Sequence, residues 1–374
     1  MLKIKHIRLK EKYGEGEIPH EAKTGTGPLL LTISFPYVRD WLNEHPFRNE
    51  PDARLICNLI NGSPIGPDAI DKVMKQLTLW ITIITLSIAV GSSFISIKIV
   101  LDFLPPLFAF SIRFIISGAV LILVSYIFDR KNQEIKKIKL WTNSLFIGIF
   151  MIYGGHGLIA WGAQFLTAGT ASLLNSTIPL WVALLMFLLF HYKIINLTKI
   201  GLLLGFGGML ILVGPSIGGN GSDLVGIASL LLSSLSMAIA SVYYSRVSLP
   251  QSVLLSAGML MLIGGALQLI SSAILGELNL LPSYSDITLN FLLSYLFLIF
   301  IGTVIPMVEL FWLLKVSTAS IATTFAFIAP IVAVLLGWAI LGEPVTYLTV
   351  LATIVILMGV ALIVRTSEKK QLLS

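Results

Sequence analysis

The chain from Leu77 to Val364 is a succession of long apolar runs, and this limits its fold more than any other feature. A helix needs about 20 mostly apolar residues to cross the hydrocarbon core of a bilayer. Such runs occur ten times, at 77–98, 104–128, 141–163, 168–190, 197–215, 224–246, 252–275, 289–313, 316–340 and 344–364. The predicted fold class is therefore an all-α membrane protein with ten transmembrane helices.

Composition divides the chain into two parts. Charged residues make up only 12% of the chain, and its mean hydropathy is +0.91, whereas soluble proteins carry about 25% charged residues. Residues 1–75 nevertheless hold 11 of the 25 Lys and Arg and 10 of the 19 Asp and Glu. We expect a short soluble α/β segment over 1–73, followed by the membrane part and a cytoplasmic tail over 365–374.

The membrane part contains an internal repeat. Thr167–Pro179 reads TAGTASLLNSTIP and Thr318–Pro330 reads TASIATTFAFIAP, and the two stretches align without a gap at an offset of 151 residues. The same offset places Gly208 over Gly359. Each repeat, 77–215 and 224–364, holds five spans. Because five is odd, the second copy enters the membrane from the opposite face, so the repeats are predicted to be inverted, as in many secondary transporters that work by alternating access.

Basic residues predict the orientation. The connector 129–139 carries five Lys or Arg residues, and further basic residues follow the fourth, sixth, eighth and tenth spans. The alternate connectors hold acidic residues instead, namely Asp102, Asp223, Glu277 and Asp286. By the positive-inside rule, both termini are predicted to lie on the cytoplasmic side. The predicted location of the protein is the cell membrane.

Several function classes lack their residues here. The net charge of +6 is typical of basic cytoplasmic loops, so we expect no nucleic-acid partner. A single cysteine, Cys57, excludes an intrachain disulfide and an all-cysteine metal site. The glycine runs are not followed by a Walker Lys-Ser/Thr, which argues against ATP-driven pumping. We expect no metal, no cofactor and no enzymatic activity.

The residues from about 77 to 364 resemble the EamA-type transporters of the drug/metabolite transporter superfamily. The resemblance rests on Gly91-Ser-Ser-Phe…Lys98, Leu104-Pro-Pro…Arg113-Phe114, and Ala329-Pro330…Gly342-Glu343-Pro344 with Met358-Gly359-Val360. It implies export of metabolites, amino acids or drugs, often against a proton gradient. The chain departs from the family pattern at one place, since His191-Tyr192 stands in the first repeat where Gly342-Glu343 stands in the second.

Two ionisable residues inside predicted spans are candidates for the substrate cavity. Such residues are costly in a membrane and usually face a polar interior or a partner. His156 lies in the third span and Glu309 in the eighth, and the repeat alignment places His156 over Met307, two residues from Glu309. They are candidates for a proton-sensitive pair. The alternatives are a structural hydrogen-bonded pair, or two groups that do not meet.

A second cluster of charges is predicted near the ends of the first two spans, from Lys98, Asp102 and Arg113. The favoured interpretation is an interfacial ion pair with extended side-chain stems. The alternative is a site for a substrate carboxylate or phosphate, because the planar guanidinium of Arg matches such groups.

The remaining candidates concern motion and the cavity wall. Prolines inside spans leave a backbone carbonyl without its donor and are candidate hinges; they are Pro179, Pro306 and Pro330, of which the first and last are matched by the repeat. Aromatic and amide side chains that could line the cavity are Trp161, Gln164, Asn175, Tyr243 and Trp312. Aromatic residues near span ends also serve as interface anchors.

The first 73 residues resemble part of the catalytic domain of archaeal tyrosine recombinases (integrases). Lys23 matches the hairpin lysine that helps protonate the leaving group in that family, and residues 35–46 match a helix that ends at a proline. No segment matches the family's arginine motif, His-x-x-Arg box or nucleophilic tyrosine. We expect a non-functional integrase-like fragment, from either a gene fusion or an over-extended reading frame.

The leading hypothesis is thus a secondary transporter in the lipid bilayer with a small-molecule substrate as its expected partner, and with proton coupling and a homodimer both left open. Two alternatives differ in class. A membrane enzyme would need a nucleophile–base pair or a metal-ligand spacing, which we do not find in the sequence. A membrane-anchored, integrase-like DNA-binding fusion would need the recombinase residues that the N-terminal segment lacks.

Overall fold

The computed structural model describes residues 67–128, 138–191, 196–214, 221–244, 246–250, 252–283, 288–317 and 325–371. The chain divides into two compact units, Met1–Leu77 and Thr78–Ser374. Of the predicted soluble segment 1–73, only residues 67–73 are described, as the first two turns of a helix. The α/β character of this segment and its integrase-like motifs, including Lys23, lie outside the described residues.

All regular structure in the described ranges is helical, which confirms the predicted all-α class. Nine helical stretches there are long and apolar enough to cross a membrane, and a tenth apolar helix, α16, is shorter, with 17 residues. The long helices of the first repeat are α4 (Pro67–Leu101), α5 (Pro106–Phe128), α6 (Ile138–Gly148), α7 (Gly157–Ala163), α8 (Ala168–Asn175), α9 (Ile178–Phe190) and α10 (Asn196–Val213). Those of the second are α11 (Gly221–Tyr244), α12 (Val253–Ile274), α13 (Leu289–Ile299), α14 (Ile305–Val316), α16 (Phe325–Leu341) and α17 (Tyr347–Gln371).

Three short elements complete the fold. The π-helix η4 (Ile149–His156) lies between α6 and α7, and the π-helix η8 (Phe300–Val304) lies between α13 and α14. The 3₁₀ helix η6 (Glu277–Leu280) follows α12. The third and eighth spans therefore each consist of two α-helical pieces joined by a wider π segment.

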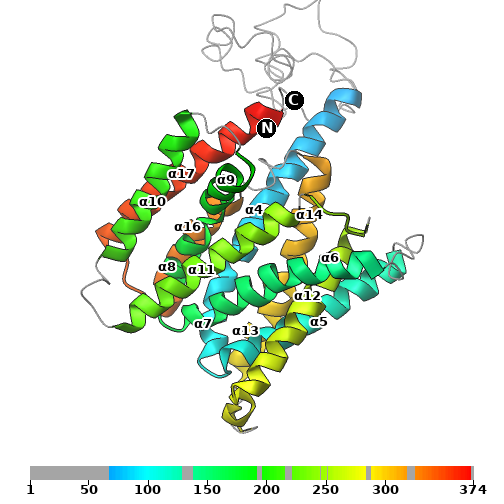
Figure 1. The fold of residues 1–374 in the computed structure, drawn as a ribbon, viewed down its shortest axis with the longest axis vertical. Helices are drawn as coiled ribbons and strands as arrows, with labels where there is room; N and C mark the ends of the chain where they lie inside the picture. The colour runs from blue at the N-terminus through cyan, green and yellow to red at the C-terminus, as the bar shows by residue number, and fades with distance from the viewer. Residues whose placement is uncertain are drawn as a thin grey trace, which may run out of the picture. The chain divides into compact units, whose positions relative to one another are not determined.

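The most extensive helix pairings join equivalent helices of the two repeats, α5 with α12 and α10 with α17 (Figure 1). Glycines allow the close approach of α10 and α17. A Cβ at Gly201 would lie 2.8 Å from the Gly359 carbonyl oxygen, and one at Gly208 would lie 2.9 Å from the Ile356 nitrogen. Rising numbers on α10 thus meet falling numbers on α17, so these helices are antiparallel.

The α5–α12 pair is antiparallel as well. At one end the hydroxyl of Ser125, late in α5, lies 2.9 Å from that of Ser252, which caps the start of α12. At the other end the carboxylate of Glu277, just after α12, accepts a 2.9 Å hydrogen bond from the N–H of Phe108 near the start of α5. Equivalent helices that run in opposite directions are what an inverted repeat requires.

The outer surface of the described helices is apolar. Large apolar side chains stay exposed at positions such as Leu203 and Trp338, which are 75% and 62% exposed. In a soluble protein such contiguous apolar surface would be unusual, whereas in a bilayer it contacts lipid tails. The buried interior instead holds many hydroxyl groups, including those of Ser117, Ser144, Ser233 and Ser234.

The three candidate hinge prolines occupy different local settings. Pro179 stands in the first turn of α9, where a missing N–H is tolerated. Pro306 stands in the first turn of α14, which follows η8 without a break. Pro330 lies inside α16. The fourth span is interrupted at Ser176 and Thr177, between α8 and α9. Their role as hinges stays a prediction.

Candidate functional site

The two π segments occupy matched positions of the repeats. η4 begins at Ile149 and η8 at Phe300, which differ by the repeat offset of 151 residues. Local sequence favours both interruptions, because η4 contains Gly154-Gly155 and η8 contains Gly302 followed by Pro306. Pro306 has no N–H to donate to the Gly302 carbonyl one turn earlier. π segments inside α-helices are rare and frequently occur at functional sites.

Polar side chains of neighbouring helices donate hydrogen bonds to the carbonyl oxygens of η4. On α11, the Ser233 hydroxyl donates to the Gly155 oxygen at 2.8 Å and the Ser236 hydroxyl to the Phe150 oxygen at 2.6 Å. On α12, the Gln268 amide donates to the Ile152 oxygen at 2.9 Å. These bonds satisfy carbonyls that the π geometry leaves accessible.

The corresponding contacts of η8 come from α5. The Ser117 hydroxyl donates to the Ile299 oxygen at 3.3 Å, and the repeat offset places Ser117 over Gln268. Arg113 lies one turn earlier. Its Nε donates to the Thr303 hydroxyl at 2.6 Å and its Nη2 to the Gly302 carbonyl oxygen at 3.2 Å. Thr303 in turn donates to the Leu298 oxygen at 2.7 Å.

The Arg113 side chain is buried, with 3% of its surface exposed. Its guanidinium carbon lies 5.0 Å from the ring centroids of both Phe110 and Phe114, within cation–π range. The remaining nitrogen, Nη1, is buried and has no hydrogen-bond partner among the residues that the structure describes. The groups that Arg113 bonds, the Thr303 hydroxyl and the Gly302 carbonyl, are both neutral.

His156, the last residue of η4, packs on one of the same rings. Its ring centroid is 4.9 Å from that of Phe114, which also contacts Arg113. Arg113 is thus hydrogen-bonded to η8 and shares the Phe114 ring with His156 of η4.

The three residues of the predicted charge cluster have different surroundings in the structure. The Lys98 ammonium donates to the Ala163 carbonyl oxygen at 3.1 Å, and Asp102 is exposed at the end of α4. Among these three described residues, the expected ion pair with Asp102 is not formed. Arg113 instead reaches the π segment of the eighth span.

Glu309 on α14 contacts the first span. Its Oε1 accepts a 2.8 Å hydrogen bond from the Thr85 hydroxyl on α4, while its Oε2 is buried without a partner. Glu309 and His156 therefore have different partners, and no described contact brings the two together. Thr85 was not predicted as a site residue, because a threonine in an apolar span gives no signal of its own.

The other cavity candidates are spread over the bundle. Trp161 and Trp312 are 41% and 37% exposed, and the exposed Gln164 donates to the Trp161 carbonyl oxygen at 3.1 Å. The Tyr243 ring packs 4.2 Å from that of Phe146. Asn175 ends α8 and has a buried Oδ1 without a partner. Gln268 and Thr303 were not among the predicted site residues, although an amide inside an apolar span was a signal for the former.

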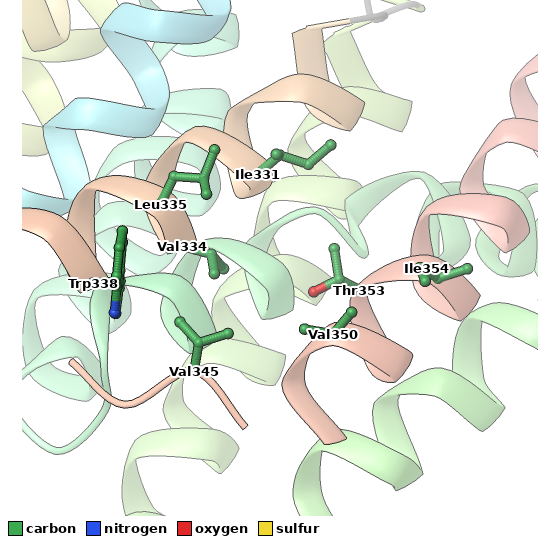
Figure 2. Close-up of a pocket in the computed structure, with 8 residues that line it drawn as sticks. All are labelled: Ile331, Val334, Leu335, Trp338, Val345, Val350, Thr353 and Ile354. Carbon is green, nitrogen blue, oxygen red and sulfur yellow. The ribbon is translucent and has the colours of Figure 1, made fainter. Parts of the chain in front are cut away.

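A hollow of about 360 Å³ lies elsewhere, between α16 and α17 (Figure 2). Its lining side chains are Ile331, Val334, Leu335, Trp338, Val345, Val350, Thr353 and Ile354, of which only Trp338 and Thr353 carry a polar atom. The Thr353 hydroxyl donates to the Thr349 carbonyl oxygen at 2.6 Å. The hollow is therefore largely apolar and holds no charged side chain.

Known proteins share both the sequence and the fold. The EamA-like transporter family matches residues 78–214 and 224–365, which are the two repeats. The uncharacterized inner membrane transporter YedA of Escherichia coli strain K12 is 30% identical over 295 residues, covering 78% of this chain and 92% of that protein. The uncharacterized transporter YoaV of Bacillus subtilis is 27% identical, covering 74% and 94% of the two chains.

Two further similarities extend the range. A WAT1-related chloroplastic protein of Arabidopsis thaliana is 27% identical over 288 residues, covering 76% of this chain and 69% of that protein. A solved crystal structure superposes with a TM-score of 0.54 and 18% identity, covering 79% of this chain and 99% of that one. At this identity the likeness concerns the fold alone.

Proposed function

The chain belongs to the EamA-like transporter family, and we propose that it is a secondary transporter that exports a small metabolite, amino acid or drug by alternating access. Both termini lie in the cytoplasm in this proposal, because the basic connectors follow the even-numbered spans. The substrate crosses between the two repeats.

The observation that carries the proposal is the antiparallel packing of equivalent helices, together with the matched positions of the two π segments. The α5–α12 and α10–α17 pairs relate the repeats, and η4 and η8 begin at matched residues. Two inverted copies of one unit can exchange conformations, which gives states of similar free energy that open to opposite sides of the membrane. Local departures from regular helix near the repeat interface supply points where this exchange can occur.

Glu309 is the proposed site of proton exchange. Its carboxylate lies inside a span, with one oxygen bonded to Thr85 and the other buried without a partner. A buried carboxylate with one oxygen lacking a partner is stabilised when it binds a proton. It releases this proton when the surrounding helices open and water solvates the carboxylate. Proton binding would thereby favour one conformation over the other. His156 and the exposed Trp161, Trp312 and Gln164 are secondary candidates for cavity contacts.

The test is uptake into proteoliposomes that hold the purified full chain, with and without a pH gradient, against a panel of amino acids, amines and metabolites. Wild type is expected to accumulate at least one compound faster when a proton gradient is imposed. Glu309→Gln should fold and reconstitute normally but lose the response to the gradient. Transport in Glu309→Gln that responds to pH as wild type does would remove Glu309 from the mechanism.

A further inference from the structure

The buried charge of Arg113 has no described counter-ion. Three of the described carboxylates accept hydrogen bonds from groups other than Arg113. Glu309 accepts from the Thr85 hydroxyl, Glu277 from a backbone N–H at the start of α5, and Glu343 from the N–H of Ala168. Of the other acids whose side chains the structure describes, Asp102 is exposed and Asp223 lies at the start of α11. A charge held away from water without a partner of opposite sign is strongly unfavourable.

The geometry fixes where a counter-ion would bind. Nε and Nη2 of Arg113 are bonded to Thr303 and Gly302, so the guanidinium plane is held and Nη1 is the nitrogen that stays available. The rings of Phe110 and Phe114 each lie 5.0 Å from the guanidinium carbon, and His156 packs on the second ring. Because the two ring centroids are only 6.0 Å apart, the rings lie to one side of the group. An anion bound at Nη1 would therefore meet one fixed positive charge beside two aromatic rings.

The second repeat has no equivalent of the Arg113 site. The repeat offset places Arg113 over Gly264, and a Cβ at Gly264 would overlap the side chain of Ile152 in η4. The second repeat thus has no room for a long cation at the matched position. One chain carries one such site, and a binding site for an asymmetric molecule is expected to break the repeat in this way.

We propose that Arg113 binds the carboxylate of the transported molecule through Nη1, so that the substrate is a small organic monoanion or zwitterion. A single cation and a single free nitrogen match a singly charged carboxylate better than a phosphate dianion, which recruits several donors. The assignment rests on the proposed function. Because Nη1 is shielded from solvent in this structure, the substrate reaches it only when the contacts of α5 with η8 and η4 open, as alternating access provides.

Ligand-induced thermal stabilisation of the detergent-solubilised full chain tests the assignment. The probes are monocarboxylates (the standard amino acids and short aliphatic and aromatic acids), each compared with its amide and its decarboxylated amine; L-leucine, L-leucinamide and isoamylamine form one such set. At least one acid should raise the melting temperature of wild type while its amide and amine do not. Chloride and inorganic phosphate are titrated as separate arms.

Variants separate recognition from folding. Arg113→Gln should weaken binding of that acid at least tenfold, and Arg113→Lys, which keeps the charge, should weaken it less. Ser111→Ala is the matched control, because Ser111 also lies buried on α5 but its hydroxyl donates within the same helix, to the Phe108 carbonyl oxygen at 2.7 Å. It should bind the acid as wild type does. If Arg113→Gln does not fold, Arg113→Lys and the comparison of acid with amide on wild type decide the matter.

Four results would overturn the assignment: no stabilisation by any acid, equal stabilisation by acid and amide, unchanged binding in Arg113→Gln, or stabilisation by chloride alone. Proteoliposome flux keeps this assignment distinct from the transport function. Wild type that moves leucinamide or isoamylamine but no carboxylate would leave the transporter standing and remove Arg113 as the anion site. Carboxylates that bind through Arg113 but cross no membrane would instead overturn the proposed transport.

Discussion

The carboxylate of Glu343, in the connector before α17, accepts the backbone N–H of Ala168, the first residue of α8, at 2.8 and 3.0 Å from its two oxygens. A connector of the second repeat thus caps a helix of the first repeat. Glu277 caps α5 in the same way. The repeat offset places these two glutamates over Tyr192 and Tyr126, so the caps belong to one side of the membrane part only. The departure from the family pattern, a tyrosine at 192 where the second repeat has Glu343, therefore removes this kind of cap from the opposite side of the membrane part.

Replacing Glu343 should weaken the fold at this end. Glu343→Ala removes both the acceptor and the negative charge at the positive end of α8, and loss of an N-terminal cap costs about 0.5–2 kcal/mol. We expect a lower melting temperature in detergent micelles, and a smaller decrease for Glu343→Gln, which keeps an acceptor oxygen. Asp102→Ala, at an exposed carboxylate, is the control. Equal melting temperatures for Glu343→Ala and wild type would contradict the capping role.

The C-terminus of α9 offers a stabilising substitution. His191 has φ = 53°, and it is the single non-glycine residue with a positive φ in the described ranges; its repeat equivalent Gly342 has φ = 66°. A side chain in the left-handed region costs roughly 1 kcal/mol, which glycine avoids. His191→Gly should therefore raise the free energy of unfolding by up to about 1 kcal/mol. Gly342→Ala should lower it by a similar amount.

Chemical or thermal unfolding in the same detergent measures both variants. The two substitutions act as each other's control, because they exchange residue types at matched positions of the repeats. A lower stability of His191→Gly would mean that the imidazole makes a contact worth more than the backbone strain.

Much of this architecture could be predicted from the sequence, because the length of an apolar run and the offset of a repeat are properties of the chain itself. The ten spans, the all-α class and the opposite direction of the repeats follow from them. The π segments could not be predicted, since Gly154-Gly155 and Pro306 are equally compatible with an ordinary kinked helix. The contact of Arg113 with Gly302 joins residues 189 apart in sequence, so it depends on how α5 packs against η8.

The expected meeting of His156 and Glu309 illustrates a second limit. Sequence alignment of the repeats places the two near equivalent positions. An in-plane two-fold axis, however, carries a residue to the opposite side of the axis, so equivalent positions need not be neighbours. In the structure His156 packs on Phe114 of α5, whereas Glu309 bonds Thr85 of α4.

The Thr85 hydroxyl should matter for transport through Glu309. Thr85→Val keeps the shape of the side chain but removes the 2.8 Å hydrogen bond to Oε1, leaving neither carboxylate oxygen with a described partner. A hydrogen bond to a charged group contributes about 1.5–3 kcal/mol. The pH dependence of uptake into proteoliposomes should therefore differ from that of wild type, because the lost hydrogen bond acts on the carboxylate itself.

Thr85→Ser restores a hydroxyl and should restore the wild-type profile. A profile that stays unchanged in Thr85→Val, while Glu309→Gln abolishes the response to pH, would mean that the carboxylate works without this bond. Loss of uptake in Thr85→Ser as well as Thr85→Val would point to packing of α4 rather than to the hydroxyl.

The α10–α17 contact should tolerate no side chain at Gly359. A Cβ there would lie 2.5 Å from the Gly205 nitrogen and 2.7 Å from the Gly201 carbonyl oxygen. Both neighbours are backbone atoms that no change of rotamer can move, so Gly359→Ala must separate the helices, and overpacking of this kind costs typically 1–3 kcal/mol. Gly207→Ala is the matched control on α10, because a Cβ at Gly207 meets nothing within 4 Å. Thermal unfolding in one detergent should show a clear decrease for Gly359→Ala and none for Gly207→Ala, and similar melting temperatures for the two would show that the repeats do not depend on this close approach.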